Sequence, residues 1–425
     1  MSRGFRSGGA SQFRLSHNNG PIDALFIKRS LSAAHHFPKS WQTKAPYHDD
    51  HYVTPPNQVG NLGGKSQFNI INNSYTYWAG GVLNYARDAG VVGGGGAARN
   101  TQFAGYDAIQ EVQVKYGSQL IWSMPGEEFV WIHHHRMITE HQNAIANYVA
   151  GPRTPAQRAA DFLVANEYFL EVPFPWESES NPLPMATGSD ILVIIQWRQI
   201  SQLVEAVDSL NPPTSVTKPI TAGSQNFYFK GIQVPQDESL ALQSLANQDS
   251  GIMQMMNDVF VITADADQQL SASDQLFEIP LTSLNRPIRT ITAVVQLASD
   301  LDTAFDRNPY DGRGGDDDPE ITVSITGCGD TTGTIKADVP YQVRVWDDIR
   351  RETQPRNDAL FKINFCKRPQ NNKAYSGSFN FGSTNNAQFR IGLRDTQSRI
   401  VRVTLYCEVL NVSQVVQGQL RNLFA

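Results

Sequence analysis

The sequence of 425 residues is poor in the features that stabilise small secreted proteins or anchor a chain in a membrane. Three cysteines, Cys328, Cys366 and Cys407, are too few for a disulfide framework. Cys366 and Cys407 stand among apolar, strand-forming residues, so we predict that both are buried thiols. No hydrophobic run approaches the roughly 20 residues of a membrane-spanning helix. The first 14 residues lack the apolar core of a signal peptide.

Catalytic motifs are missing as well. There is no Gly-x-Ser-x-Gly elbow, no Cys-His pair at a recognisable spacing and no zinc-type pair of cysteines. The glycine-rich stretch 90–96 lacks the Lys-Ser/Thr of a phosphate-binding loop and is predicted to be a plain loop. We therefore expect neither an enzyme nor a bound cofactor.

The balance of charge is mildly acidic, with a formal net charge of -6. A folded body of this charge does not favour general nucleic-acid binding, which calls for a basic surface. The exception is residues 1–20, where Arg3, Arg6 and Arg14 stand among Gly and Ser. This segment is predicted to be a flexible basic arm. It is either a simple disordered terminus or a contact to a neighbouring subunit, a membrane or nucleic acid.

Histidines occur only in the first part of the chain, and one group of them resembles a metal site. His133 and His135 would share one face of a strand, and Glu140 follows at a spacing close to that of cupins. A cupin needs a later histidine too, and none follows His141. We interpret these residues as a surface or interface cluster and keep metal binding as the alternative. The group His48-Asp49-Asp50-His51 is interpreted as part of an exposed loop.

An acidic, glycine-containing stretch covers residues 302–320. It begins like a calcium loop at Asp306 and Asn308, but Tyr310 and Asp311 occupy places that an EF-hand does not allow. We interpret it as a long solvated insertion between strands, with a bound divalent ion as the alternative.

The end of the chain carries the clearest strand pattern. Apolar residues alternate along 400–409, where Val401, Val403, Leu405, Cys407 and Val409 fall on one face. This period of two indicates a half-buried strand. The run 388–394 repeats the pattern, and the four polar residues 395–398 form a connection of hairpin length.

Short strands separated by turn-rich segments continue through the whole chain and predict an all-β protein. The best helix begins at Thr154, which can cap it, and continues from Pro155 to Leu163. Ile191–Ile195 is a continuous apolar run, as in a strand covered on both faces. The stretch 209–224, rich in Pro, Ser and Thr, is predicted to separate two similar domains, at 21–210 and 211–425.

Several segments resemble one family, the double jelly-roll major capsid proteins of large eukaryotic DNA viruses and tailless membrane-containing phages. The run Tyr375-Ser376-Gly377-Ser378-Phe379-Asn380-Phe381, followed by Asn386-Ala387-Gln388-Phe389, is similar to the family's P-S-G-S-x-N-F…N-A-x-L pattern. Asn285-Arg286-Pro287-Ile288 resembles its N-H-P-x motif, and 173–186 resembles the region that closes its first jelly roll. The early family motif is only faintly echoed at 26–29, which suggests a divergent member.

The resemblance implies two consecutive eight-stranded antiparallel jelly rolls, with short helices in loops. It implies a structural virion protein whose homotrimers, hexagonal in outline, contact neighbouring capsomers and tile an icosahedral capsid. Minor capsid or penton proteins and an internal membrane are the further implied partners, with Arg3, Arg6 and Arg14 in contact with one of them. Assembly in the host cytoplasm is implied too.

Two other functions fit an all-β chain of this length. One is a bicupin-like metal-dependent enzyme with His133, His135 and Glu140 as ligands. The other is a carbohydrate-binding β-sandwich protein.

Overall fold

The computed structural model describes the chain between residues 48 and 422, with gaps. The described ranges are 48–70, 77–129, 148–151, 154–176, 182–185, 190–208, 210–234, 236, 239–240, 243–244, 247, 252–264, 267–271, 275–298, 322–326, 334–340, 360–366, 377–381, 387–393, 399–416 and 419–422.

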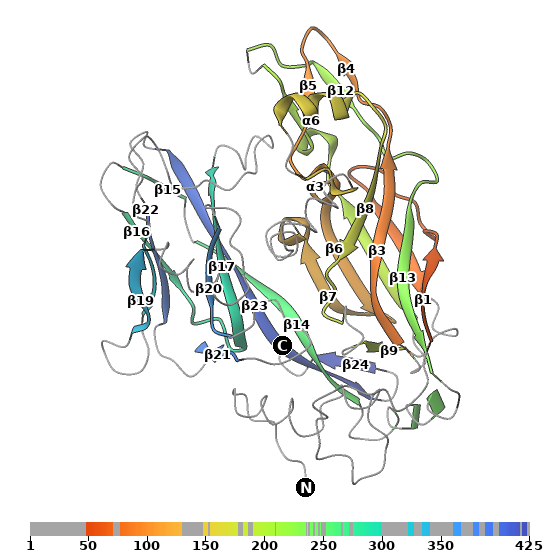
Figure 1. The fold of residues 1–425 in the computed structure, drawn as a ribbon, viewed down its shortest axis with the longest axis vertical. Helices are drawn as coiled ribbons and strands as arrows, with labels where there is room; N and C mark the ends of the chain where they lie inside the picture. The colour runs from red at the N-terminus through yellow and green to blue at the C-terminus, as the bar shows by residue number, and fades with distance from the viewer. Residues whose placement is uncertain are drawn as a thin grey trace. The chain divides into compact units, whose positions relative to one another are not determined.

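The first half of the chain forms a sandwich of two antiparallel sheets (Figure 1). One sheet has the spatial order β1 (His48–Thr54), β13 (Asn226–Gln233), β3 (Tyr77–Arg87) and β8 (Asn166–Val172). The other has the order β2 (Lys65–Ile70), β10 (Ile191–Trp197), β6 (Ile109–Tyr116) and β7 (Gln119–Pro125). Most connections cross from one sheet to the other, as in a jelly roll built from Greek keys.

The second half repeats this arrangement. One sheet has the order β14 (Ile252–Thr263), β23 (Ile400–Val416), β17 (Pro287–Leu297) and β20 (Leu360–Asn364). The other has the order β16 (Gln275–Pro280), β22 (Gln388–Leu393), β18 (Thr322–Thr326) and β19 (Thr334–Pro340). When the eight strands are numbered within each half, both halves have the sheet orders 1-8-3-6 and 2-7-4-5. The predicted fold class, two eight-stranded jelly rolls, is confirmed.

The repeat extends to a short extra strand in each jelly roll. β9 (Leu183–Pro184) lies between the sixth and seventh strands and pairs with the first two residues of β3. β21 (Phe379–Asn380) lies at the same point of the second jelly roll and pairs with the first two residues of β17. Shared detail of this kind indicates that the two halves are copies of one architecture, although their sequences differ.

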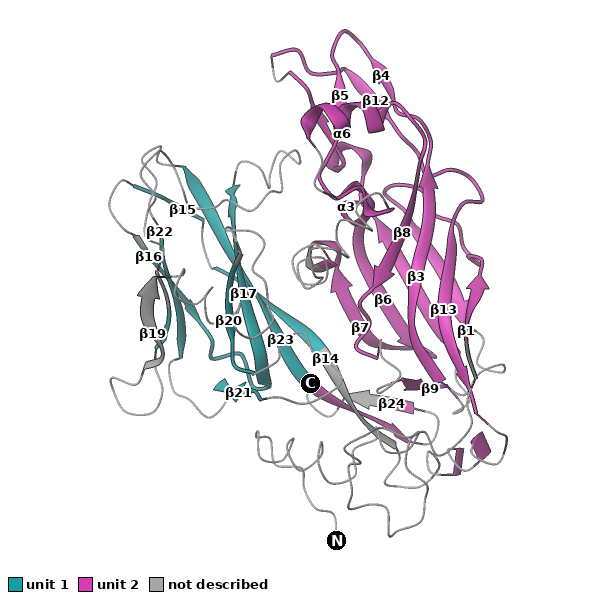
Figure 2. Ribbon diagram, in the orientation of Figure 1, with its two compact units in different colours: residues 1–14, 134–138, 257–410 teal, residues 15–133, 139–256, 411–425 magenta. Residues whose placement is uncertain are grey.

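The boundary between the halves lies later than the sequence suggested. β13 pairs with β1 and β3 of the first sheet, so the first jelly roll continues to Gln233 and the predicted boundary at residue 210 is wrong. The Pro-rich stretch is a loop within the first jelly roll, because turn residues mark loops and linkers alike. Figure 2 divides the chain into two compact units. Among the described residues, Asn257–Leu410 form the teal unit and the rest the magenta unit.

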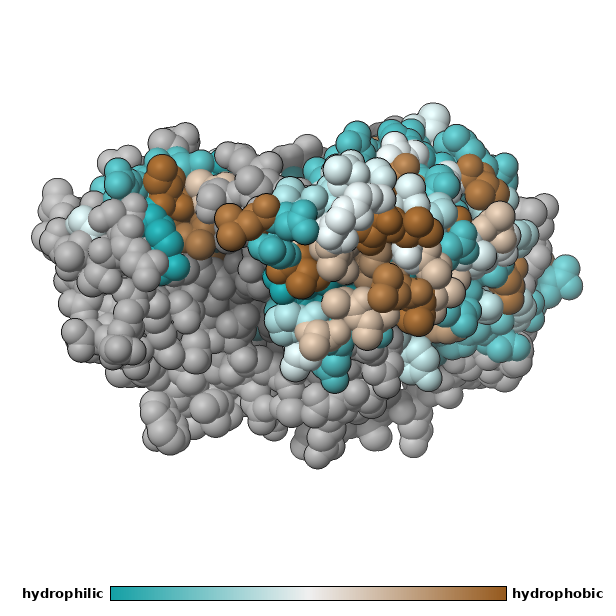
Figure 3. Space-filling view, turned by 90° about the horizontal axis from the view of Figure 1, so that it is seen from above, coloured by the Kyte–Doolittle hydropathy of each residue, from teal (hydrophilic) through white to brown (hydrophobic). Residues whose placement is uncertain are grey.

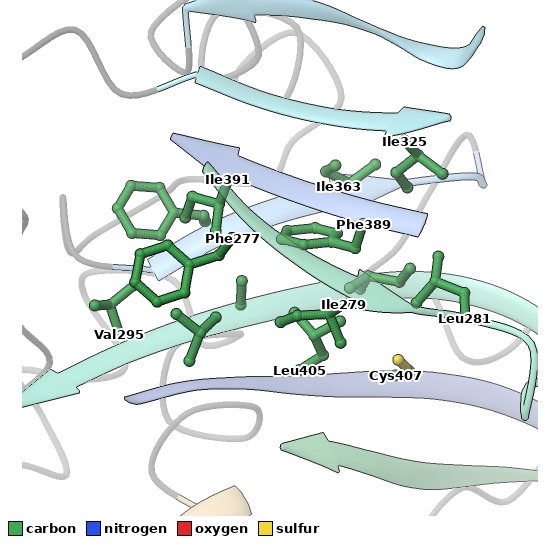
Figure 4. Close-up of a cluster of buried hydrophobic side chains, with 14 of the residues drawn as sticks. Phe277, Ile279, Leu281, Val295, Ile325, Ile363, Phe389, Ile391, Leu405 and Cys407 are labelled. Atoms are coloured by element: carbon green, nitrogen blue, oxygen red, sulfur yellow. The ribbon is translucent and has the colours of Figure 1, made fainter. Parts of the chain in front are cut away.

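The core of the second jelly roll lies between its two sheets (Figure 4). Phe389, Ile391 and Leu393 on β22 are buried, as are Val403 and Leu405 on β23. These are the alternating positions that the sequence pattern predicted. Cys366 and Cys407, which the sequence predicted to be buried thiols, are both buried.

The connection of hairpin length after β22 does not form a hairpin. β22 pairs with β16 and β18, whereas β23 pairs with β14 and β17, so the two strands belong to different sheets. β23 also departs from the half-buried pattern, because Tyr406 and Glu408 on its second face are buried too. The alternating pattern correctly predicted which side chains of β23 face the core. It did not predict that the side chains on the other face are buried as well.

In the first jelly roll, large aromatic side chains fill the space between the sheets. The rings of Phe68 on β2 and Phe227 on β13 have centroids 5.8 Å apart, and those of Tyr85 on β3 and Trp197 on β10 are 4.8 Å apart. Trp78 packs edge-on against Trp176 at 5.1 Å. The first two of these contacts join the two sheets across the core.

Two of the family-like motifs meet in the second jelly roll. Pro287 pairs with Asn380 and Ile288 with Phe379, which joins the Asn-Arg-Pro-Ile segment to the Ser-Gly-Ser-Phe-Asn-Phe segment. Gly377 has φ 130, and a Cβ there would lie 3.2 Å from the carbonyl oxygen of Phe365. The positive φ favours glycine, and a side chain here would make a tight contact with the backbone of Phe365.

The remaining elements are short. They are α3 (Ala104–Asp107), α4 (Gly126–Glu128), α6 (Pro155–Phe162), the 3-10 helix η3 (Ile200–Gln202), β4 (Val91–Gly93), β5 (Ala98–Asn100), β11 (Val204–Ala206), β12 (Ser215–Thr217), β15 (Gln268–Gln269) and β24 (Gln419–Asn422). The predicted helix is α6. Its capping box is present, since the Thr154 side chain accepts from the Gln157 amide and the Gln157 side chain accepts from the Thr154 amide.

We predict that Leu405→Ala lowers the free energy of unfolding by about 2 to 5 kcal/mol, because it leaves a cavity between two packed sheets. Leu276→Ala, at a side chain that is 52% exposed in the same jelly roll, should change it by less than about 0.5 kcal/mol. Urea unfolding measures both values. Equal losses would contradict the assigned core.

We predict that Gly377→Ala destabilises the protein more than Gly223→Ala does. Both glycines have positive φ, at 130 and 74, but a Cβ at Gly223 would meet nothing within 4 Å. Gly223→Ala should cost about 1 kcal/mol of backbone strain. Gly377→Ala adds a clash with backbone, so thermal unfolding of this variant should begin at a clearly lower temperature than that of the Gly223 variant.

Candidate functional site

The site residues predicted from sequence lie outside the described residues. This holds for His133, His135 and Glu140, for Arg3, Arg6 and Arg14, and for the acidic stretch 302–320. The prediction that His48–His51 lie in a loop is wrong, because these residues belong to β1. Asp50 and His51 are exposed there. Where the chain is described, no group of three or more His, Cys, Asp or Glu side chains could hold a metal ion. None of the described helices is long and apolar enough to cross a membrane.

The described feature that stands out from the two sandwiches is a group of elements at one end of the first jelly roll. It consists of α6 and two small sheets, β4 with β12 and β5 with β11 (Figure 1). We call these elements the end cap. They come from three separate loops of the jelly roll, so the cap forms only when the barrel is folded. β4 also corrects the prediction of a plain loop at 90–96, since it pairs with β12.

A buried ion cluster fastens α6 to the small sheet β5–β11. The Glu205 carboxylate on β11 accepts from Arg158 Nη1 on α6 at 2.8 Å and from Arg99 Nε on β5 at 2.5 Å. Arg158 also donates to the carbonyl of Asn100 at 3.1 Å. Burial raises the pKa of Glu205, and the two arginines oppose that rise. A buried carboxylate is tolerated here because it is paired twice.

The C-terminal end of α6 is closed by a buried lysine from the loop after β12. Lys218 Nζ donates to the carbonyls of Val164 at 2.7 Å, Phe162 at 2.8 Å and Asp161 at 3.2 Å. Its ammonium lies 5.4 Å from the centre of the Phe162 ring. These carbonyls have no partner within the helix, so the lysine caps it. Burial lowers the pKa of Lys218 to about 7; Arg87 adds to this effect, while Asp161 and Asp88 oppose it.

Arg87, the last residue of β3, lies beside Lys218. Its side chain follows Leu83 and Tyr85 along the inward face of the strand and is fully buried. Nε donates to the Lys218 carbonyl at 3.4 Å. Nη1 and Nη2 are buried and have no hydrogen-bond partner. Arg87 of the barrel and Lys218 of the loop that caps α6 are therefore two adjacent buried cations at the junction between the end cap and the barrel.

The outside of the end cap is partly apolar. Figure 3 views the molecule from this end and shows hydrophobic side chains among polar ones on the described surface. The exposed hydrophobic side chains of the cap and its loops are Leu210 at 94%, Val91, Leu163, Val164 and Val207. Single exposed apolar residues are common, but a group at one end of a barrel is a surface that can bind protein.

Comparison with known proteins agrees with the topology. PBCV-1 VP54 has a TM-score of 0.67 at 11% identity, over 92% of this chain and 99% of that one. The Faustovirus major capsid protein has a TM-score of 0.64 at 8% identity, over 89% of this chain and 92% of that one. A chain of the Sputnik virophage has a TM-score of 0.62 at 8% identity, over 93% and 92%.

The chain has the double jelly-roll fold. The matched proteins are double jelly-roll capsid proteins, and the match extends over nearly the whole of each chain. No protein-family model matches the sequence, and no curated protein matches it. At sequence identities of 8% to 11%, the chains share the backbone fold but few side chains.

The sequence did not lead us to predict that Arg87 and Lys218 are buried, although it contains a signal for Arg87. Along β3, Leu83 and Tyr85 precede Arg87 at intervals of two, which puts an arginine on the apolar face of a strand. Lys218 gave no such signal, because it lies in the Pro-rich stretch that suggested a linker.

We predict that the free energy of unfolding rises with pH between about 7 and 9, by up to about 1.4 kcal/mol per pH unit from Lys218 alone. In this window the unfolded lysine binds a proton and the folded one does not, so raising the pH favours the folded state. Below pH 7 both forms are protonated and the contribution is flat.

The measurement is chemical unfolding at several pH values. Lys218→Met should reduce the slope, whereas Lys65→Met, at an exposed lysine of β2, should leave it unchanged. An unchanged slope in the Lys218 variant would contradict the prediction.

Proposed function

We propose that this protein is the major capsid protein of an icosahedral virus. The observation that carries the proposal is the double jelly roll itself, with the same strand order twice and a backbone match to capsid proteins over nearly the whole chain. The two jelly rolls account for almost all of the described residues. The protein is a building block rather than an enzyme.

The repeat supports a trimer as the assembly unit. Three copies of a chain with two similar barrels place six barrels around one three-fold axis, which gives the capsomer a hexagonal outline. Objects of this outline fill a surface without gaps. A single jelly roll would need six independent chains for the same arrangement.

The partners follow from this role. Neighbouring trimers contact one another within the capsid, and minor capsid or penton proteins occupy the positions that trimers cannot fill. The basic arm at residues 1–20 contacts a minor protein or an internal membrane, where Arg3, Arg6 and Arg14 suit anionic groups. Assembly takes place in the host cytoplasm.

The match to capsid proteins favours this function over a bicupin-like enzyme or a carbohydrate-binding β-sandwich protein. A bicupin would use His133, His135 and Glu140 as metal ligands. Its function would require a bound metal, whereas a capsid protein needs only surfaces that fit one another.

The test is the mass and shape of the purified full-length chain. Size-exclusion chromatography with light scattering should give three times the chain mass of 47.2 kDa, and negative-stain microscopy should show hexagonal particles. A monomer with one equivalent of metal, lost in the double variant His133→Ala and His135→Ala, would instead establish the bicupin-like function. A monomer that binds glycans without assembling would establish the carbohydrate-binding one.

A further inference from the structure

Arg87 is a buried cation, and no counterion to it is found in the part of the chain that the structure describes. Its side chain has no exposed surface, and the side-chain hydrogen bond seen among the described residues is the long one from Nε to the Lys218 carbonyl. Because Nη1 and Nη2 have no partner, no carboxylate oxygen lies within hydrogen-bond distance of either atom. A guanidinium cannot lose its charge by deprotonation in a protein, so burial leaves a full positive charge to be compensated.

Among the described residues, no carboxylate is hydrogen-bonded to the Arg87 Nη atoms, although the charges of Asp88 and Asp161 act on the neighbouring Lys218. Lys218, a second buried cation, lies close enough for the two charges to repel each other. The nearby backbone carbonyls of Asp161, Phe162 and Val164 accept hydrogen bonds from Lys218. Asp88, the neighbour of Arg87 in the chain, accepts from the Thr221 hydroxyl at 2.6 Å.

Opposite Arg87, β8 presents a second unsatisfied polar group. Asn166 is the cross-strand partner of Arg87, and its Oδ1 atom is buried without a hydrogen-bond partner. Cross-strand partners lie on the same face of a sheet with their Cβ atoms about 5 Å apart. The unpaired Nη atoms of Arg87 are donors and call for an acceptor, whereas the unpaired Asn166 oxygen is itself an acceptor and does not bind an anion.

We propose that the first jelly roll binds a small monovalent inorganic anion of the halide class at the Nη atoms of Arg87, beneath the end cap. A halide satisfies several N–H donors at once and neutralises the charge, which a water molecule cannot do. A large oxyanion or an organic anion does not suit a side chain that is fully enclosed.

The site would couple anion binding to the stability of the cap. Arg87 belongs to β3 of the barrel, and Lys218 closes the last turn of α6 in the cap. At pH values below about 7, where Lys218 is charged, repulsion between the two cations weakens this junction, and an anion at Arg87 offsets that repulsion. The occupied site therefore holds the cap on the barrel more firmly.

The first experiment measures stability of the full-length protein against chloride concentration at constant ionic strength, with gluconate as the replacing anion. A ligand that binds only the folded state lowers the unfolding equilibrium constant by up to tenfold for each tenfold rise in free ligand above its dissociation constant. We expect this logarithmic chloride dependence in the native chain and its loss in Arg87→Met, while Arg402→Met, at a partly exposed arginine of β23 paired with Asp267, retains it. A chloride dependence that is equal in all three proteins, or absent from the native chain, would overturn the proposal.

The second experiment does not depend on a folded variant. Crystals of the native protein grown in bromide are examined by anomalous diffraction at the bromine edge. A bromide peak within contact distance of Arg87 Nη1 and Nη2 supports the site. Density for water alone at this place would overturn it.

Discussion

The packing of one apolar face of a sheet against another is the interaction on which the rest of this protein depends. In the second jelly roll, Phe389 and Ile391 from one sheet and Val403 and Leu405 from the other are completely buried, and they come from consecutive strands in opposite layers. Because side chains alternate along a strand, this packing fixes the register of each strand, and a slip of one residue would turn the whole apolar set outward. The crossing connections of the jelly roll follow from the need to place each such strand in the correct layer.

Unlike the apolar packing just described, one end of the first jelly roll has buried charged side chains. Aromatic rings such as Trp78 and Trp176 fill its centre, whereas Arg87, Lys218, Arg158 and Glu205 are buried where the end cap meets the barrel. Charges of this kind do not add much stability, but removing one partner of a buried group is costly, so they fix which elements go together. In this way Arg158 and Glu205 hold α6 to the small sheet β5–β11, and Lys218 and Arg87 join α6 to β3 of the barrel. The apolar side chains on the outside of the cap, such as Leu210, are not part of this buried network.

In the proposed capsid role, function lies in the outer faces of the two barrels rather than in a cleft. Such a role requires the shape of the barrels and surfaces that fit one another, and neither requires any particular side chain in the core. Two chains at 8% to 11% identity can therefore share the double jelly-roll backbone. The core needs apolar residues of suitable volume, the turns need a few glycines such as Gly377, and the outer surface is free to change with its partners.

The sequence by itself determined the class of structure and most of the strands. Alternation along β22 and β23 identified which side chains enter the core, and Thr154 with Pro155 identified α6, because these signals depend on residues close together in the chain. Only the tertiary structure decided that β22 and β23 lie in different sheets, that β13 belongs to the first jelly roll, and that Arg87 meets Lys218. Each of these depends on contacts between residues far apart in the chain. A turn-rich stretch such as 209–224 has the same composition whether it joins two domains or two strands of one barrel.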